Sequence, residues 1–144
     1  MGQQNKIDFL VEWAIWVHLD SKTDLELILL KGHLILDNIL LTVLKRKDYL
    51  DSENYSFYRK IIALETLDVE RNLNKDFIIS SLKEINNLRN KVAHEYNFDI
   101  KNGDFEIWAS NILNNLEGEK FSKYTFRTRI VHSFSILSKN ILEF

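Results

Sequence analysis

The sequence predicts an all-α protein, an antiparallel bundle of five to six helices. The 144 residues include no proline and only four glycines, so few residues interrupt a helix. Apolar residues recur at steps of three and four through most of the chain, and no segment shows the alternation of a half-buried strand. With 45% hydrophobic and 28% charged residues, the chain is expected to form one globular domain over residues 1–144.

The first predicted helix, from about Lys6 to Leu19, is apolar nearly all round. Ile7, Leu10, Ala14 and Val17 fall on one side, and Phe9, Trp13 and Trp16 fall on the other. We expect such a helix to be buried on both sides. The second side packs either inside its own bundle or against a second subunit.

The second predicted helix runs to about Arg46 and starts at a capping box. Thr23 and Glu26 have the spacing at which two side chains cap each other's backbone N–H groups. Gly32 lies in the helix interior, where glycine costs about 1 kcal/mol relative to alanine. Its presence indicates a close crossing with another helix.

Four further helices follow from the same periodicity. They cover about Ser56 to Leu67, Lys75 to Tyr96, Asp104 to Leu116 and Lys123 to Leu142. The expected inner faces are Phe57, Ile61 and Leu64 in the first, Phe105, Trp108, Ile112 and Leu116 in the third, and Phe126, Ile130, Phe134, Leu137 and Ile141 in the last.

Three histidines lie outside any recognisable motif: His18, His33 and His132. We interpret them as surface or packing residues. His33 and Asp37 are four residues apart, a spacing that puts two side chains on one helix face. We interpret this pair as a surface ion pair or hydrogen bond rather than as half of a metal site.

The helix from Lys75 to about Tyr96 has one residue that breaks its own apolar stripe. The stripe is Ile78, Leu82, Ile85, Val92 and Tyr96. The position between Ile85 and Val92 should be apolar, yet it holds Arg89. A guanidinium cannot lose its proton, and burying it unpaired is costly. We therefore expect Arg89 to face a carboxylate, a hydrated cavity or an anionic ligand.

Asn90 directly follows this arginine, and His94 comes five residues after it. An arginine holds a phosphate and stabilises its developing charge, and a histidine moves protons near neutral pH. Together they suit metal-independent RNA cleavage, in which the 2′-OH attacks its own phosphate. Arg89 and His94 lie roughly 140° apart on an ideal helix. They can converge only through the reach of the arginine, a bend in the helix, or a second copy of the chain.

The segment from Leu88 to Tyr96, L-R-N-K-V-A-H-E-Y, resembles the signature of the HEPN superfamily of small all-α proteins. There an Arg-Asn, a short spacer and a His lie near the end of a bundle helix. The form with a tyrosine two residues after the histidine resembles HEPN toxins that are paired with minimal nucleotidyltransferases. Residues 31–38 are similar, more weakly, to another helix of small HEPN proteins.

The resemblance implies an HEPN-like bundle and an endoribonuclease. Arg89, Asn90 and His94 would be its catalytic residues, in a cleft formed by a homodimer. Tyr96 would match the tyrosine that a partner nucleotidyltransferase, the antitoxin, can modify with AMP. Such a protein would act on RNA as a toxin of a toxin–antitoxin or antiphage system.

Composition restricts the other classes of function. The net charge of −2 and the pI near 6.1 argue against a protein that coats nucleic acid in bulk, so an RNA-binding protein of this composition must concentrate its positive charge locally. Candidate clusters are Lys45 to Lys47, Arg59 with Lys60, Lys83 with Lys91, and Arg127 with Arg129. The chain has no cysteine, no metal-binding pattern and no Gly-rich phosphate loop, so no cofactor or metal is expected. No signal peptide is recognised and nothing approaches a membrane span, which predicts a cytoplasmic protein without a membrane partner.

Two alternatives belong to other classes of protein. In one, the same Arg-Asn-His group binds a nucleotide phosphate or an acidic partner without turnover. In the other, the chain is a helical oligomerisation or regulatory protein in which Arg89 is paired internally, for example with Glu65 or Glu84.

Overall fold

The structure, a computed structural model, describes residues 10–17, 19, 24–69, 74–118 and 126–144. Its α-helices are a first helix over residues 10–17, α2 (Leu25–Arg46), α3 (Phe57–Thr66), α4 (Lys75–His94), α5 (Asp104–Asn115) and α6 (Phe126–Leu142). A short 3₁₀ helix, Ser52–Asn54, lies between α2 and α3. Within these described ranges there is no strand, so the predicted all-α class is confirmed.

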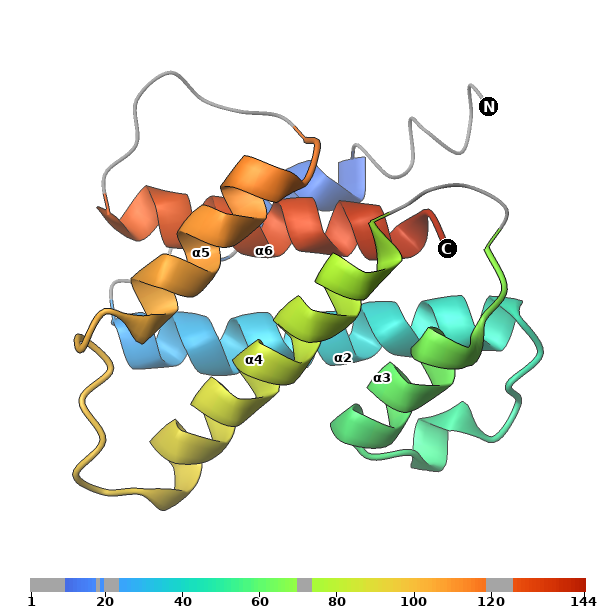
Figure 1. Ribbon diagram of the computed structural model, residues 1–144, viewed down its shortest axis with the longest axis horizontal. Helices are drawn as coiled ribbons and strands as arrows, with labels where there is room; N and C mark the ends of the chain where they lie inside the picture. Colours follow the sequence, from blue (N-terminus) through green and yellow to red (C-terminus); the bar gives the residue numbers. More distant parts are fainter. Residues whose placement is uncertain (1–9, 18, 20–23, 70–73, 119–125) are drawn as a thin grey trace.

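The helices form two crossing layers (Figure 1). α2 and α6 lie side by side and run in the same direction, while α4 and α5 run antiparallel to each other across them. α3 packs against both α2 and α4. This arrangement places the C-terminal half of α4 beside α2 and α3 on one flank and beside α5 on the other.

α6 is buried nearly all round, more completely than its apolar stripe predicts. Ile130, Phe134, Leu137 and Ile141 are fully buried as expected, but His132, Ser133, Ser135 and Ser138 are buried as well. The hydroxyls of Ser133 and Ser135 donate to backbone carbonyl oxygens three residues earlier, at 2.5 Å and 2.8 Å. These local bonds allow polar side chains to enter the core.

The close crossing predicted at Gly32 is confirmed. A Cβ at this position would lie 2.5 Å from a ring carbon of Phe134 on α6, closer than real Cβ atoms approach other groups. The ring is fully buried and packs against Trp108 at 4.9 Å between centroids. Only a glycine therefore permits this contact between α2 and α6.

Helix starts and ends differ slightly from the predictions. The N-cap of α2 is Asp24, whose carboxylate accepts a hydrogen bond from the Glu26 backbone N–H at 2.8 Å. Glu26 therefore contributes its backbone to the cap, and Thr23 lies outside the described residues. α4 ends at His94, two residues before the predicted Tyr96.

The first helix is buried on one side only. Ile15 and Leu19 are buried, whereas Leu10, Trp13 and Val17 are between two-fifths and three-fifths exposed. The prediction of burial on both sides within the chain is therefore wrong over the described part of this helix. Contact of the exposed side with a second subunit stays a prediction.

α2 corrects the expectation that no segment approaches a membrane span. By length and composition alone it is long and apolar enough to cross a membrane, and half of its most apolar stretch is buried inside the protein. Ile28, Leu36 and Leu40 are fully buried in the core. A core helix of a soluble protein meets the same criterion, so the feature is weak evidence for a membrane span.

Candidate functional site

The Arg-Asn-His motif lies in the last turns of α4, where the helix stops in a short turn. The backbone N–H of Glu95 donates to the carbonyl of Lys91 at 2.9 Å, and that of Phe98 donates to the carbonyl of Glu95 at 3.0 Å. Lys91 and His94 are basic residues in the final turn, where positive charge complements the helix dipole.

Leu88, and not Arg89, occupies the core position after Ile85. The stripe of α4 steps by three from Ile85 to Leu88, which is 6% exposed, and then by four to the partly buried Val92. Arg89 is half-buried at the edge of this stripe. The prediction that Arg89 falls inside the apolar stripe is wrong. Leu88 and Arg89 are adjacent in sequence, so only one of them can lie on the inner face of α4, and the apolar Leu88 is the one that is buried.

Arg89 nevertheless has no acidic partner among the described residues. Its Nη1 donates a long bond of 3.4 Å to the amide oxygen of Asn90, its neighbour in sequence. The two acids considered for internal pairing are engaged elsewhere. Glu65 lies 3.7 Å from Lys83, and Glu84 accepts from Ser80 at 3.5 Å.

Asn90, His94 and Tyr96 are all exposed, and Tyr96 is fully so. Within the described parts of the chain, no hydrogen bond or ion pair joins His94 to Arg89 or Asn90. The structure thus places the motif residues on one end of α4 without bringing Arg89 and His94 together.

A polar network from three helices includes Asn86, which lies one helical turn before Arg89 on α4. His33 of α2 is buried, and its Nε2 lies 3.1 Å from the amide oxygen of Asn86 on α4, to which it donates. The His33 ring also packs against Phe57 of α3, with 4.0 Å between centroids. Asp37 of α2 accepts from Nζ of Lys60, on α3, at 2.6 Å. The interpretation of His33 and Asp37 as a surface pair is wrong, because each bonds to another helix.

Burial and neighbouring charges both act on the pKa of His33. Burial lowers the pKa of His33 below its usual 6.5, while the hydrogen bond with Asn86 raises it. The cations of Arg89 and Lys60 lower the pKa further, and the carboxylate of Asp37 raises it. Three charged side chains therefore lie within electrostatic reach of one imidazole.

Lys60 is the residue of this network that the sequence interpretation missed. The sequence predicts only a local cluster of positive charge formed by Lys60 and Arg59, whereas the Lys60 side chain is only 6% exposed. The spacing of Lys60 from the apolar residues of α3 indicates its buried position. Lys60 stands three residues after Phe57 and four before Leu64, on the inner face of α3.

Most of the cationic clusters found in the sequence are already engaged. The pairs are Lys45 with Glu53, Lys83 with Glu65, Arg129 with Glu106, Arg46 with the carbonyl oxygen of Leu142, and Arg59 over the ring of Tyr55. Arg89 differs from these residues because it is half-buried and still lacks an acid among the described residues.

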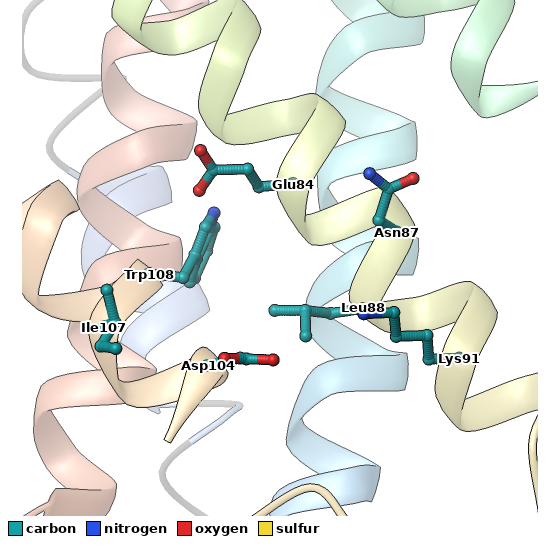
Figure 2. A pocket seen from close by; sticks show the side chains of 7 residues that line it. All are labelled: Glu84, Asn87, Leu88, Lys91, Asp104, Ile107 and Trp108. Atoms are coloured by element: carbon teal, nitrogen blue, oxygen red, sulfur yellow. The ribbon is translucent and has the colours of Figure 1, made fainter. Parts of the chain in front are cut away.

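The other flank of α4 carries an open pocket of about 250 Å³ (Figure 2). It is lined by Glu84, Asn87, Leu88 and Lys91 from α4 and by Asp104, Ile107 and Trp108 from α5. Arg89, Asn90 and His94 are not part of it. Two carboxylates and one ammonium give this pocket an excess of negative charge, which disfavours a phosphate.

No protein-family model matches the chain, and no curated protein or solved structure matches it either. The HEPN resemblance rests on the motif residues and stays a prediction. Among the described residues, no group of three His, Asp or Glu side chains is placed to hold a metal ion.

Proposed function

We propose that this protein is a metal-independent endoribonuclease of the HEPN type that acts as a homodimer. One observation carries the proposal. Arg89 is half-buried and has no acidic partner in the described chain, and an exposed histidine follows five residues later on the same helix. Such an arginine is suited to an anionic ligand, and the histidine adds a group for proton transfer.

In the proposed reaction, the 2′-OH of an RNA nucleotide attacks the adjacent phosphorus. A bond forms from O2′ to phosphorus, and the bond from phosphorus to O5′ breaks. His94 accepts the proton of the 2′-OH, and water supplies a proton to the O5′ leaving group. Arg89 binds the non-bridging phosphate oxygens, where negative charge grows, and Asn90 orients the phosphate or the histidine. The product carries a 2′,3′-cyclic phosphate.

The homodimer follows from the divergence of the two residues on α4. His94 and Arg89 lie roughly 140° apart around an ideal helix, so one copy cannot direct both at one phosphate without a bend. Two α4 ends meeting across a two-fold axis bring Arg89 of one protomer toward the partner's His94. Asn90, His94 and Tyr96 are exposed and thus available for such a contact.

Tyr96 is the proposed control point. Its full exposure just beyond the end of α4 leaves the phenol open to a modifying enzyme. The phenol oxygen would attack the α-phosphorus of ATP and release pyrophosphate, with a minimal nucleotidyltransferase as the enzyme. The AMP group would add a negative charge beside the motif and repel RNA. With this control, the proposed role is that of a cytoplasmic toxin in a toxin–antitoxin or antiphage system.

A second candidate function is a binding module without turnover. The observation that favours it is the same divergence, because Arg89 alone can bind a phosphate in a single copy while His94 remains distant. This candidate predicts a monomer or dimer that binds RNA or a nucleotide and leaves RNA intact.

The test is RNA cleavage by purified protein in excess EDTA. Wild type, Arg89→Ala and His94→Ala are compared, each checked for folding by circular dichroism. We expect cleavage by wild type and a loss of about 100-fold or more in both variants, as for removal of one preorganised transition-state contact. Intact RNA with all three folded proteins would overturn the ribonuclease and leave the binding module.

A further inference from the structure

Lys91 lies inside the motif, between Arg89 and His94, and the reaction above gives it no role. It is exposed in the final turn of α4. Among the described residues, no carboxylate forms an ion pair with it, although Glu84 and Asp104 line the same pocket (Figure 2). An exposed ammonium that is not paired with an acid is available to bind a phosphate.

The helix places Lys91 on the side of His94 and not on that of Arg89. All three residues belong to α4. At 100° per residue, Lys91 and His94 are about 60° apart, whereas Lys91 and Arg89 are about 160° apart. Side chains three residues apart are neighbours on a helix surface. The two cations of the motif therefore leave α4 in nearly opposite directions, and only Lys91 shares a face with the histidine.

Phe98 orients the ammonium of Lys91 toward the end of α4. The centre of its ring lies 5.8 Å from Nζ of Lys91, within the range of cation–π attraction. The ring is held in place because Phe98 packs against the core, and its backbone N–H donates to the carbonyl of Glu95 at 3.0 Å. The positive charge of Lys91 thus lies near the turn that follows His94.

We propose that Lys91 binds a second RNA phosphate, next to the scissile one, beside the His94 of its own protomer. This inference rests on the proposed function and adds a substrate-binding residue to the same site. Arg89 of one protomer binds the scissile phosphate, and the partner contributes both its His94 and its Lys91. The substrate is therefore an RNA strand with at least two consecutive phosphates.

A lysine suits the neighbouring phosphate better than it suits the transition state. Its ammonium is a compact point charge on a flexible stem, whereas the planar guanidinium of Arg89 donates two directed hydrogen bonds to one phosphate. A contact with a phosphate that does not react is equally strong in the ground state and the transition state. Its loss should therefore raise KM and leave kcat unchanged.

The first experiment measures binding of a fluorescein-labelled 2′-O-methyl RNA, which cannot be cleaved, by fluorescence anisotropy at several salt concentrations. Lys91→Gln should bind about tenfold more weakly at low salt. Its plot of log affinity against log salt should be shallower than that of wild type by about 0.7, the value for one phosphate of a single strand. Lys91→Arg keeps the charge and should restore both quantities.

Lys83→Gln is the matched control for this experiment. It removes the same charge from the same helix, but Lys83 lies 3.7 Å from Glu65 and is already paired. It should bind RNA as wild type does. A salt slope in Lys91→Gln equal to that of wild type, or equal losses in the two variants, would overturn the inference.

Substrate length distinguishes a second phosphate from the scissile one. A dinucleotide with a single phosphodiester offers Lys91 no neighbouring phosphate. Lys91→Gln should raise KM about tenfold for an oligonucleotide and keep cleavage of the dinucleotide within about twofold of wild type, whereas Arg89→Ala should lose both activities. Equal losses of Lys91→Gln on both substrates would show that Lys91 acts on the scissile phosphate, which contradicts the assignment.

Mixed dimers assign Lys91 to a protomer. Lys91→Gln refolded with Arg89→Ala forms mixed dimers with one complete site, and roughly a quarter of wild-type cleavage should return. Lys91→Gln refolded with His94→Ala forms no complete site and should not exceed the activity of Lys91→Gln alone. The reverse pattern would place Lys91 with the Arg89 of its own protomer and overturn the inference.

The outcomes for this inference and for the proposed function are distinct. If wild type binds RNA without cleaving it, the ribonuclease fails, and a shallower salt slope in Lys91→Gln still supports the phosphate contact. If wild type cleaves RNA and Lys91→Gln behaves as Lys83→Gln does, the ribonuclease stands and the inference fails. Absence of RNA binding by wild type would overturn both.

Discussion

The two flanks of α4 differ in charge although they belong to one helix. On the flank that faces α2 and α3, Asn86 bonds to a buried histidine and Arg89 has no acid partner among the described residues. On the flank that faces α5, Glu84 and Asp104 line an open pocket with a single cation, Lys91 (Figure 2). The pocket is the more obvious cavity, but its charge opposes phosphate. Of the two flanks, the one with Arg89 offers a cation without an acidic partner among the described residues, whereas Lys91 shares the pocket with two carboxylates, and for this reason the proposed function assigns the scissile RNA phosphate to the Arg89 flank rather than to the pocket.

The largest expected effect concerns Leu88, the residue between the two flanks. Leu88→Ala should lower the free energy of unfolding by about 2–5 kcal/mol, since the leucine is buried and its loss leaves a cavity. Arg89→Ala should change it by roughly 0.5 kcal/mol or less. Urea denaturation of both variants measures the difference. A greater loss for Arg89→Ala would instead support a guanidinium paired inside the protein.

The next largest effect is a difference in stability between alanine variants of two adjacent asparagines. Asn86→Ala removes the hydrogen bond to buried His33 and should cost about 1–3 kcal/mol, because the imidazole N–H loses its acceptor. Asn87→Ala, on the exposed flank, should cost about 0.5 kcal/mol or less. Thermal unfolding of the pair at one pH is the measurement. Similar losses of stability in the two variants would show that the His33–Asn86 hydrogen bond does not stabilise the packing of α4 against α2.

The stability contributed by the flank of α4 that faces α2 and α3 should also depend on pH. The pKa of His33 is lowered in the folded protein from 6.5, so below pH 6.5 the unfolded chain binds the proton more readily. The contribution of His33 to stability is thus fully present above that pH and is lost as the pH falls toward the lowered folded-state pKa. Replacing His33 with Gln should flatten the fall between neutral and mildly acidic pH. The free energy of unfolding is measured by denaturant titration at several pH values. If its dependence on pH is the same in the His33→Gln variant and in wild type, this assignment is contradicted.

The smallest effect is expected on the α5 flank. Glu84→Gln and Asp104→Asn each remove one negative charge from the pocket without altering its size. RNA cleavage should stay within about twofold of wild type, because exposed charges are screened beyond roughly 10 Å. A loss near that of Arg89→Ala would show that the pocket, and not the Arg89 flank, holds the substrate.

The fold was predictable from the sequence because it follows local periodicity. Spacing alone predicts the inner faces of α3 and α5, that of α6 from Ile130 onward, and the close crossing at Gly32. Periodicity alone does not decide between Leu88 and Arg89 as the inner residue after Ile85, because steps of three and of four residues fit a helix equally well. Apolar Leu88 beside charged Arg89 was the signal that should have decided it.

The network beside the motif could not be predicted in the same way. His33, Lys60 and Asn86 come from three helices, and their partners depend on how these helices cross. The sequence analysis assigns Lys60 only to a cationic cluster with Arg59, although its spacing from Phe57 and Leu64 fits the inner face of α3. Likewise, the spacing of Arg89 and His94 predicted their divergence on α4 but gives no arrangement of two copies.

The central claim, a site shared between two copies, is tested most directly by mixing two inactive variants. Arg89→Ala and His94→Ala are prepared separately and then unfolded and refolded together. A mixed dimer keeps one intact site, with Arg89 from one protomer and His94 from the other. Random pairing predicts recovery of roughly a quarter of wild-type RNA cleavage. No recovery, although the mixed dimer forms and wild type cleaves RNA, would contradict a shared site and show that each copy acts alone.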